Sequence, residues 1–329
     1  MAHCCLTERA GRGQAPGMRH PFRAMVVIAL VFVCLVGVAI HSSNPEEVSY
    51  HGKSLSQWLE QLDDHAAGNG VMWSPLPRKT PGQIEAADAI RALGTNAIPG
   101  LMHDLAVNDS RYFEFLQEAQ QYIREKILRK PRGTFSQSVT PAQKIRWKAA
   151  LAMDALGSAA QSTIPQLASM AIKTSSSSSC KEASFILAGM GPPGIAALTN
   201  YSLSPNSWQH ICAIWAIGQH PQSSANLVPW LLDFATNRPS GAAGGYPGEI
   251  WALGEIHADA ARVVPMLIEE LSNTNGSLPY WEQSAAVEAL GHYGKEASPA
   301  VPALEGMKAD PQLRWAAEEA LKKINSDSQ

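Results

Sequence analysis

The chain has 329 residues, of which 45% are hydrophobic and 17% are charged, and its formal net charge is −3. This charge gives nucleic acid no general attraction, so we expect no nucleic-acid partner. Residues 42–329 carry 22 basic and 28 acidic residues, a net charge of −6, which makes the body of the chain mildly acidic.

The N-terminal region contains a membrane-targeting segment. Residues 24–40 are an uninterrupted run of 17 apolar residues, with basic residues before it and polar residues after it. That length is at the lower limit for a membrane span and slightly above a signal-peptide core. We therefore predict a basic leader at 1–23, with Met18 as an alternative start, a membrane anchor or signal segment at 24–40, and a polar linker at 41–53.

The charges around the apolar segment indicate its orientation. Positive residues precede it, and Glu46 and Glu47 follow it, which favours a cytoplasmic N-terminus. We expect a single-pass, membrane-anchored protein with an extracytoplasmic (periplasmic) body that touches the membrane through this segment only. The alternative is a secreted or periplasmic protein after signal cleavage.

The first predicted helix follows the linker. Ser54 can cap it, and Leu55, Trp58, Leu59 and Leu62 then fall at i, i+3, i+4 and i+7 on one apolar face. Residues 68–82 are dense in glycine and proline, which indicates a loop, and helix resumes at about residue 81.

The rest of the chain contains several imperfect copies of one sequence repeat. The clearest copies are AIGQHPQSSANLVPWL, ALGEIHADAARVVPML and ALGHYGKEASPAVPAL, whose glycines are 36 and 37 residues apart. A proline follows each glycine eleven residues later, and this spacing fits one helical hairpin per repeat. The sequence therefore predicts an all-α fold, a right-handed α-solenoid at 54–325 with a tail at 326–329.

The glycines and prolines of the repeats have a mechanical explanation. We predict that each proline opens the second helix of its hairpin, because a missing N–H costs nothing in a first turn. We predict that each glycine closes the first helix, because a residue tolerant of positive φ ends a helix there at low cost. The predicted structural turns are at Gly94, Gly157, Gly218, Gly254 and Gly291.

The same phrases carry a family resemblance. The A-A-x-A-L-G turn followed by A-V-P-x-L resembles HEAT and HEAT-like (phycobilisome-lyase-type) repeats over residues 84–324. YHGKSLSQWLEQL, AIRALGTNAIPGLM and LGHYGKEASPAVPAL together resemble exported bacterial HEAT-repeat proteins of a kind common in verrucomicrobia. This resemblance implies an interaction scaffold and no defined activity.

No motif in the sequence predicts catalytic, cofactor-binding or metal-binding residues. His51-Gly52-Lys53-Ser54 matches the end of a phosphate-binding loop, but Glu47 stands where its first glycine is required. HEAT-like hydroxylases bind iron through His-Glu pairs, and this chain contains no His-Glu dipeptide. We therefore expect no enzyme, although an enzyme of another kind stays open.

Three tryptophans are candidates for partner binding. Trp147, Trp208 and Trp281 each stand ten residues before a repeat glycine, which is one equivalent place. Such a ring can pack between repeats, or the three can form a ladder of anchors for a partner. Trp215 and Trp251 are predicted to be core residues.

Two cysteines belong to the body of the chain. Cys180 and Cys212 could form a disulfide between neighbouring helices in an oxidising compartment. Equally, they could be two small buried core residues.

The sequence predicts a non-enzymatic scaffold that binds a protein partner through the concave face of the solenoid. Polar residues that converge in the groove would favour an accessory or catalytic (lyase-like) component acting on an exported substrate. A featureless groove would favour a structural cell-envelope protein.

Overall fold

The computed structural model describes residues 47–62, 79–109, 140–173, 177–201, 208–237, 248–272 and 280–326. The chain divides into two compact units, Met1–Glu47 and Val48–Gln329, and almost all described residues belong to the second. The predicted leader, the apolar segment at 24–40 and the start of the linker lie outside the described residues. Among the described residues, no helix is both long and apolar enough to cross a membrane.

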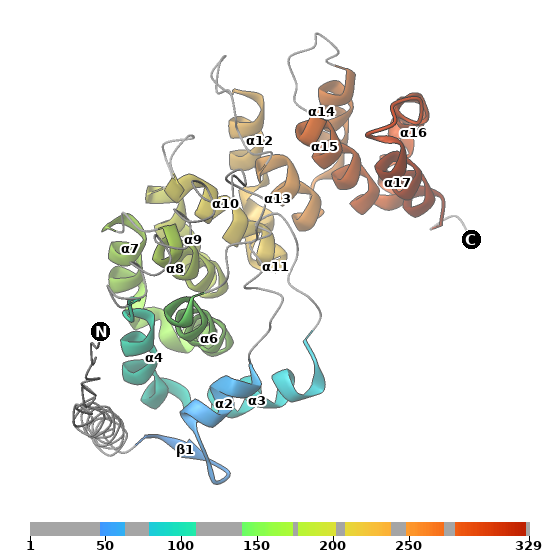
Figure 1. The fold of residues 1–329 in the computed structure, drawn as a ribbon. Coiled ribbons are helices and arrows are strands. Elements are labelled where there is room, and N and C mark those ends of the chain that lie inside the picture. The colour runs from blue at the N-terminus through green and yellow to red at the C-terminus, as the bar shows by residue number, and fades with distance from the viewer. Residues whose placement is uncertain are drawn as a thin grey trace, which may run out of the picture. The chain divides into compact units, whose positions relative to one another are not determined.

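The described part of the second unit is almost entirely helical, which confirms the predicted all-α class. Within it, the strands are β1 (Ser49–Tyr50) and β2 (Lys53–Ser54), an antiparallel hairpin that begins in the predicted linker and ends at the first residue of the predicted solenoid. The α-helices, shown in Figure 1, are α2 (Leu55–Gln61), α3 (Pro81–Leu93), α4 (Ile98–Leu105), α6 (Pro141–Leu156), α7 (Ile164–Lys173), α8 (Ser177–Gly189), α9 (Pro192–Tyr201), α10 (Trp208–Gln219), α11 (Pro221–Ser224), α12 (Val228–Thr236), α13 (Gly248–Ile256), α14 (Ala260–Ser272), α15 (Tyr280–His292), α16 (Val301–Met307) and α17 (Arg314–Ser326).

Capping boxes begin α2, α3 and α6. In α2, the Ser54 hydroxyl accepts a hydrogen bond from the backbone N–H of Gln57, and the Gln57 side chain accepts one from the backbone N–H of Ser54. Thr80 and Thr140 do the same for α3 and α6, with a glutamine three residues later. Each box satisfies two N–H groups that a helix leaves without partners, so the sequence itself fixes these starts.

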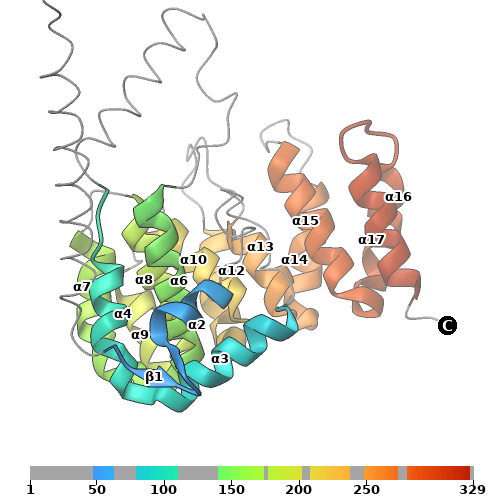
Figure 2. The same ribbon diagram turned by 60° about the horizontal axis from the view of Figure 1, so that its bottom comes forward.

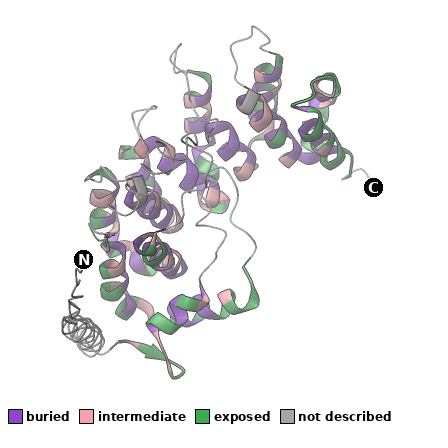
Figure 3. Ribbon diagram, viewed as in Figure 1, coloured by how far each residue is buried: buried purple, intermediate pink, exposed green. Residues whose placement is uncertain are grey.

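Six helices form one continuous row. α6, α8, α10, α13, α15 and α17, here called the helix row, pack in chain order, each against the next (Figures 1 and 2). Helices that lie between members of the row in the sequence pack on the member that follows them: α7 on α8, α12 on α13, α14 on α15 and α16 on α17. Buried residues run through every member of the row (Figure 3) and belong to one connected hydrophobic core.

Two of the predicted turn glycines are confirmed. Gly94 and Gly157 stand at the C-terminal caps of α3 and α6, with φ of 59° and 51°. A side chain strains the backbone in this left-handed region, so glycine ends both helices at low cost.

The turn prediction is wrong for Gly218, Gly254 and Gly291. All three lie inside helices of the row, in α10, α13 and α15, and none has a positive φ. In the last two repeats the positive φ falls three residues later, at His257 (56°) and Gly294 (50°). The first helix of these repeats therefore runs almost one turn further than predicted.

Close packing explains these three glycines instead. A Cβ atom at Gly254 would lie 2.8 Å from the Cβ of Ala289 on α15, and one at Gly291 would lie 3.0 Å from the Cα of Ala320 on α17. A Cβ at Gly218 would overlap the Trp251 ring on α13. Each glycine thus lets the next helix of the row approach its backbone.

The proline prediction holds in most repeats. Pro99, Pro229 and Pro302 lie in the first turns of α4, α12 and α16, as predicted. Pro265 does not, because α14 begins at Ala260 and Pro265 lies inside it. Asp259 accepts hydrogen bonds from two backbone N–H groups of that first turn, which starts this helix before the proline.

Candidate functional site: a polar groove where three helices end

The C-terminal ends of α13, α15 and α17 meet at an open groove. This end groove, about 460 Å³ in volume, is lined by the last turns of the three helices and the residues just after them. Its lining residues are Gly254, Glu255, His257, Gly291, His292, Gly294, Lys323 and Ser326. The packing glycines 254 and 291 form part of the lining, next to Glu255 and His292.

Glu255 and His292 form the central pair of the end groove. The Nδ1 atom of His292 lies 3.5 Å from Oε1 of Glu255, and both side chains are partly buried. Burial raises the pKa of Glu255, Lys323 opposes that shift, and Glu288 adds to it. Burial also lowers the pKa of His292, with Lys323 acting in the same direction.

Both pKa shifts favour the neutral forms of this pair. A neutral carboxyl group beside a neutral imidazole can hold or pass a proton, which is the chemistry of general acids and bases. The same polar pair can also hydrogen-bond a peptide or a side chain of a partner. The groove therefore fits either binding or proton transfer.

Two further histidine–carboxylate pairs connect members of the helix row. His210 Nε2 lies 2.8 Å from Oε1 of Glu249, which links α10 to α13 inside the protein. His220 Nε2 lies 2.8 Å from Oδ1 of Asp154, and its Nδ1 lies 3.0 Å from the carbonyl oxygen of Ala216. Both ring nitrogens of His220 therefore have a hydrogen-bond partner, one on α6 and one on α10.

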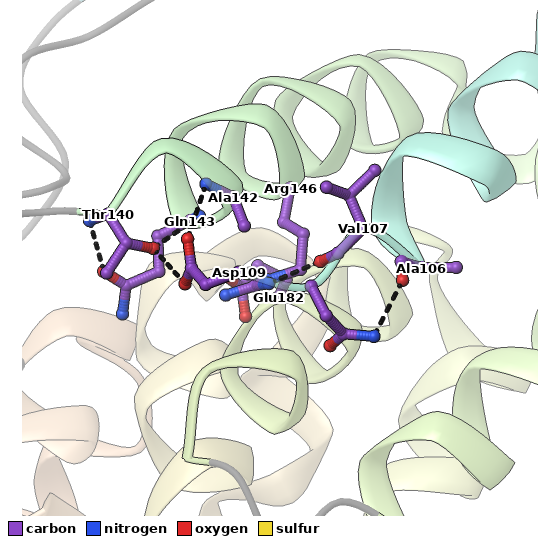
Figure 4. A network of polar contacts seen from close by, with 9 residues as sticks. Ala106, Val107, Asp109, Thr140, Ala142, Gln143, Arg146 and Glu182 are labelled. Atoms are coloured by element: carbon purple, nitrogen blue, oxygen red, sulfur yellow. Dashed lines mark hydrogen bonds and ion pairs between the residues drawn. The ribbon is translucent and has the colours of Figure 1, made fainter. Parts of the chain in front are cut away.

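A buried polar network fixes the start of α6 (Figure 4). The carboxylate of Asp109 accepts hydrogen bonds from the Thr140 hydroxyl, at 2.6 Å, and from the backbone N–H of Ala142, at 3.2 Å. Asp109 thereby binds the N-terminal end of α6, where a negative charge is favourable. This contact ties the segment after α4 to the helix row.

Arg146 and Glu182 form the centre of the same network. Arg146 donates a 2.6 Å hydrogen bond to the carbonyl oxygen of Val107, and its Nε lies 3.6 Å from Oε1 of Glu182 (Figure 4). Both side chains are buried. Burial raises the pKa of Glu182 to about 7, although Arg146 and Lys181 oppose that rise. A ligand cannot reach this pair, so we assign it a structural role.

A second cavity of about 610 Å³ lies between the β-hairpin, α2 and α3. Tyr50, His51 and Trp58 line it, and the Lys53 ammonium lies 4.1 Å from the centre of the Trp58 ring. His51-Gly52-Lys53-Ser54 was the segment similar to the end of a phosphate-binding loop. Here it turns the hairpin, and Ser54 caps α2.

The three candidate tryptophans have different surroundings. Trp147 is 7% exposed, and its ring centre lies 5.1 Å from that of Phe185 and 6.0 Å from that of Trp215, so it is a core residue and not an exposed anchor. Trp208 begins α10 and packs, half-buried, against the core. The side chain of Trp281 lies outside the described part of the structure.

The other two predicted core tryptophans and the two cysteines of the body are all buried. Trp215 and Trp251 are buried, as predicted. Cys180 and Cys212 are free thiols, both fully buried, on the neighbouring helices α8 and α10. Among the described residues, no cluster of three or more His, Cys, Asp or Glu side chains could hold a metal ion.

The sequence predicted neither the end groove nor the exposed tryptophan of α17. Glu255 and His292 each follow a repeat glycine directly, and this shared position was the available signal. Trp315 on α17 is 72% exposed, the largest value among the exposed large hydrophobic residues described. It falls outside the helical period of the buried Leu313, Ala316 and Ala320, which a helical projection could have shown.

No protein-family model matches the chain, and no curated protein is similar to it in sequence. The resemblance to HEAT repeats therefore depends on the repeated sequence motifs alone.

Proposed function

We propose that this chain is a right-handed HEAT-like α-solenoid, held outside the cytoplasm by its N-terminal segment, that binds a protein partner and performs no chemistry of its own. The observation that carries this proposal is the helix row, in which glycine contacts join α10 to α13, α13 to α15 and α15 to α17. A glycine that recurs every 36 or 37 residues and serves the same packing contact is typical of stacked repeats.

Two features of the surface support a protein partner. The end groove offers polar groups at fixed positions on three packed helices, and Trp315 offers a large exposed ring on the last of these helices. Tryptophan is favoured at binding hot spots. Because packed helices hold these groups in place before binding, little conformational entropy is lost when a partner binds.

Site-directed photo-crosslinking in cells tests the proposal. A photoreactive amino acid is placed at His257 or Ser326, which are exposed in the end groove, and as a control at Glu305, which is exposed on α16. We expect one crosslinked partner from the groove positions and none from Glu305. Equal crosslinking from all three positions, or none from any, contradicts a partner site at the groove.

The same preparation tests the location. Mass spectrometry of the purified chain identifies its mature N-terminus, which distinguishes an anchor at 24–40 from a cleaved signal. Labelling of intact cells with a membrane-impermeant amine reagent should modify exposed lysines of the body, such as Lys322. A body protected from this reagent contradicts an extracytoplasmic location.

The Glu255–His292 pair favours one second candidate, a catalytic component that acts on an exported substrate. A carboxyl group and an imidazole with shifted pKa values in an open groove are typical of catalytic sites as well as of ion pairs. Intact-mass comparison of the crosslinked partner from wild-type cells and from cells with Glu255→Gln separates the two. A mass that changes with E255Q supports catalysis, whereas an unchanged mass supports the scaffold.

A further inference from the structure

Contacts between α8 and α10 fix which of their residues face each other. The Lys181 ammonium lies 4.5 Å from the centre of the Trp215 ring, and the Phe185 ring lies 5.7 Å from it. Further along both helices, the Phe185 ring lies 4.8 Å from the ring of His220. Residue numbers rise together along this interface, so the two helices run in the same direction.

This register places Cys180 opposite Cys212. Both cysteines are fully buried, and each thiol influences the pKa of the other. The turn that carries Cys180 is itself fixed, because the Ser184 hydroxyl donates a 2.7 Å hydrogen bond to the carbonyl oxygen of Cys180 and lies 2.8 Å from the Tyr201 hydroxyl. The register of the two packed helices therefore places both buried thiols on the α8–α10 interface, facing each other.

We infer that Cys180 and Cys212 are a disulfide site that links α8 to α10 when the protein matures in an oxidising environment. The positions of the two cysteines follow from the packing of α8 on α10. The occurrence of the disulfide in cells rests on the extracytoplasmic location proposed above, since structural disulfides persist in oxidising compartments.

The chemistry is thiol–disulfide exchange with a small or protein disulfide as the oxidant. The Cys180 thiolate attacks one sulfur of the oxidant and releases the other as a thiolate. Cys212 then loses its proton, attacks the sulfur of Cys180 and releases the second thiolate. Cys180 and Cys212 lose two electrons and two protons in total, and the oxidant disulfide becomes two thiols.

The burial of both thiols decides when they can react. In the folded protein, the neighbouring Cys212 thiol lowers the pKa of Cys180, and burial raises the pKa of Cys212. Because both sulfurs are buried, an oxidant reaches them during folding or through local opening of α8 and α10. Oxidation should therefore be fast while the chain refolds and slow in the native protein.

The test uses the full chain with Cys4, Cys5 and Cys34 replaced by serine, which leaves the two body cysteines. The protein is refolded in a glutathione redox buffer, its free thiols are alkylated, and it is digested with trypsin without reduction. Cleavage after Lys181 separates the two cysteines, so a disulfide joins residues 174–181 to the peptide that contains Cys212. We expect this joined peptide, lighter by two hydrogen atoms than the sum of its parts.

Cys212→Ser is the matched control, and it should yield no joined peptide. Full alkylation of both cysteines after refolding in oxidised glutathione overturns the inference, as does capture of glutathione or of a second chain as the only disulfide. A helical circular dichroism spectrum, recorded for each sample, shows that the result belongs to folded protein.

A cellular measurement separates this inference from the proposed function. Cells are quenched in acid and alkylated before lysis, and the same peptides are analysed. A disulfide that forms in redox buffer but not in cells contradicts the extracytoplasmic location and leaves the site itself intact. Thiols that stay reduced in both overturn the disulfide site, while the impermeant-reagent labelling still decides the location.

Discussion

His220 bonds to Asp154 across a helix that separates them. Asp154 lies on α6, His220 follows α10, and α8 packs between those two helices, yet Nε2 of His220 lies 2.8 Å from Oδ1 of Asp154. Gly189, the last residue of α8, makes this contact possible. A Cβ atom there would overlap the Asp154 carboxylate and lie 3.1 Å from Nε2 of His220.

Gly189→Ala should therefore break the bond between Asp154 and His220. We expect a loss of about 1–3 kcal/mol in the free energy of unfolding, because an added methyl group has no room and a partly buried hydrogen bond is broken. Urea denaturation, monitored by circular dichroism, measures the free energy of unfolding of the variant and of the wild type. Gly82→Ala, at a glycine with nothing within 4 Å, is the control and should change stability little.

Gly254→Ala tests the packing role of the repeat glycines. The added Cβ would lie 2.8 Å from that of Ala289, so we expect a loss of about 1–3 kcal/mol in unfolding free energy. Ala289→Gly in the same chain should restore only part of this loss, because it removes the Cβ of Ala289 but leaves its Cα 2.9 Å from the added Cβ. A double-mutant cycle measures this coupling.

The double-mutant cycle distinguishes two roles for Gly254: close packing against α15 and a left-handed end of the helix. If Gly254 were needed for a left-handed helix end, Ala289→Gly would not rescue Gly254→Ala. Gly306→Ala is the matched control, since Gly306 also lies in a helix but has nothing within 4 Å of its added Cβ. Equal losses from Gly254→Ala and Gly306→Ala would contradict the packing role.

These glycines show how far the sequence could predict the fold. Periodicity and spacing predicted the helical class, and the capping pattern at Ser54 predicted the start of α2. The sequence could not separate a glycine that ends a helix, such as Gly157, from one that admits a neighbouring helix, such as Gly254, because both occur in an A-L-G phrase. Only the position of the neighbouring backbone decides between them.

The end groove was harder to predict, for a related reason. Glu255 and His292 are 37 residues apart in sequence, and no local motif joins them. Their contact depends on the register between α13 and α15, which Gly254 and Ala289 set through their close approach. The residues next to repeat glycines are candidates for such contacts, but the sequence alone does not show which of them meet.

The buried Glu182 should make stability depend on pH. Its pKa is raised from 4.5 to about 7 in the folded protein, so the folded state keeps this proton at pH values where the unfolded state has lost it. Stability from this group is therefore complete below pH 4.5, falls as pH rises toward 7, and changes no further above that. The loss is at most about 3 kcal/mol.

Glu182→Gln should remove this dependence. The amide keeps the shape of the side chain but has no proton to lose in this range, so the difference in urea midpoint between wild type and E182Q should change between pH 4.5 and 7 and stay constant above. Other titrating groups contribute equally to both proteins and cancel in the difference. A difference that is flat across the whole range would show that Glu182 stays ionised beside Arg146.

Trp315→Ala should weaken partner binding without weakening the fold. The Trp315 side chain is 72% exposed, so its removal should change the unfolding free energy by less than about 0.5 kcal/mol. Because Trp315 is proposed as an anchor for the partner, Trp315→Ala should lower the yield of the groove crosslink roughly tenfold.

The control is Ile172→Ala on α7, which removes an apolar side chain that is 55% exposed and should leave the crosslink yield unchanged. If both variants lower the yield equally, the effect is one of general surface hydrophobicity. If neither does, the partner contacts the end groove without reaching the start of α17, and the groove residues alone must then supply the recognition.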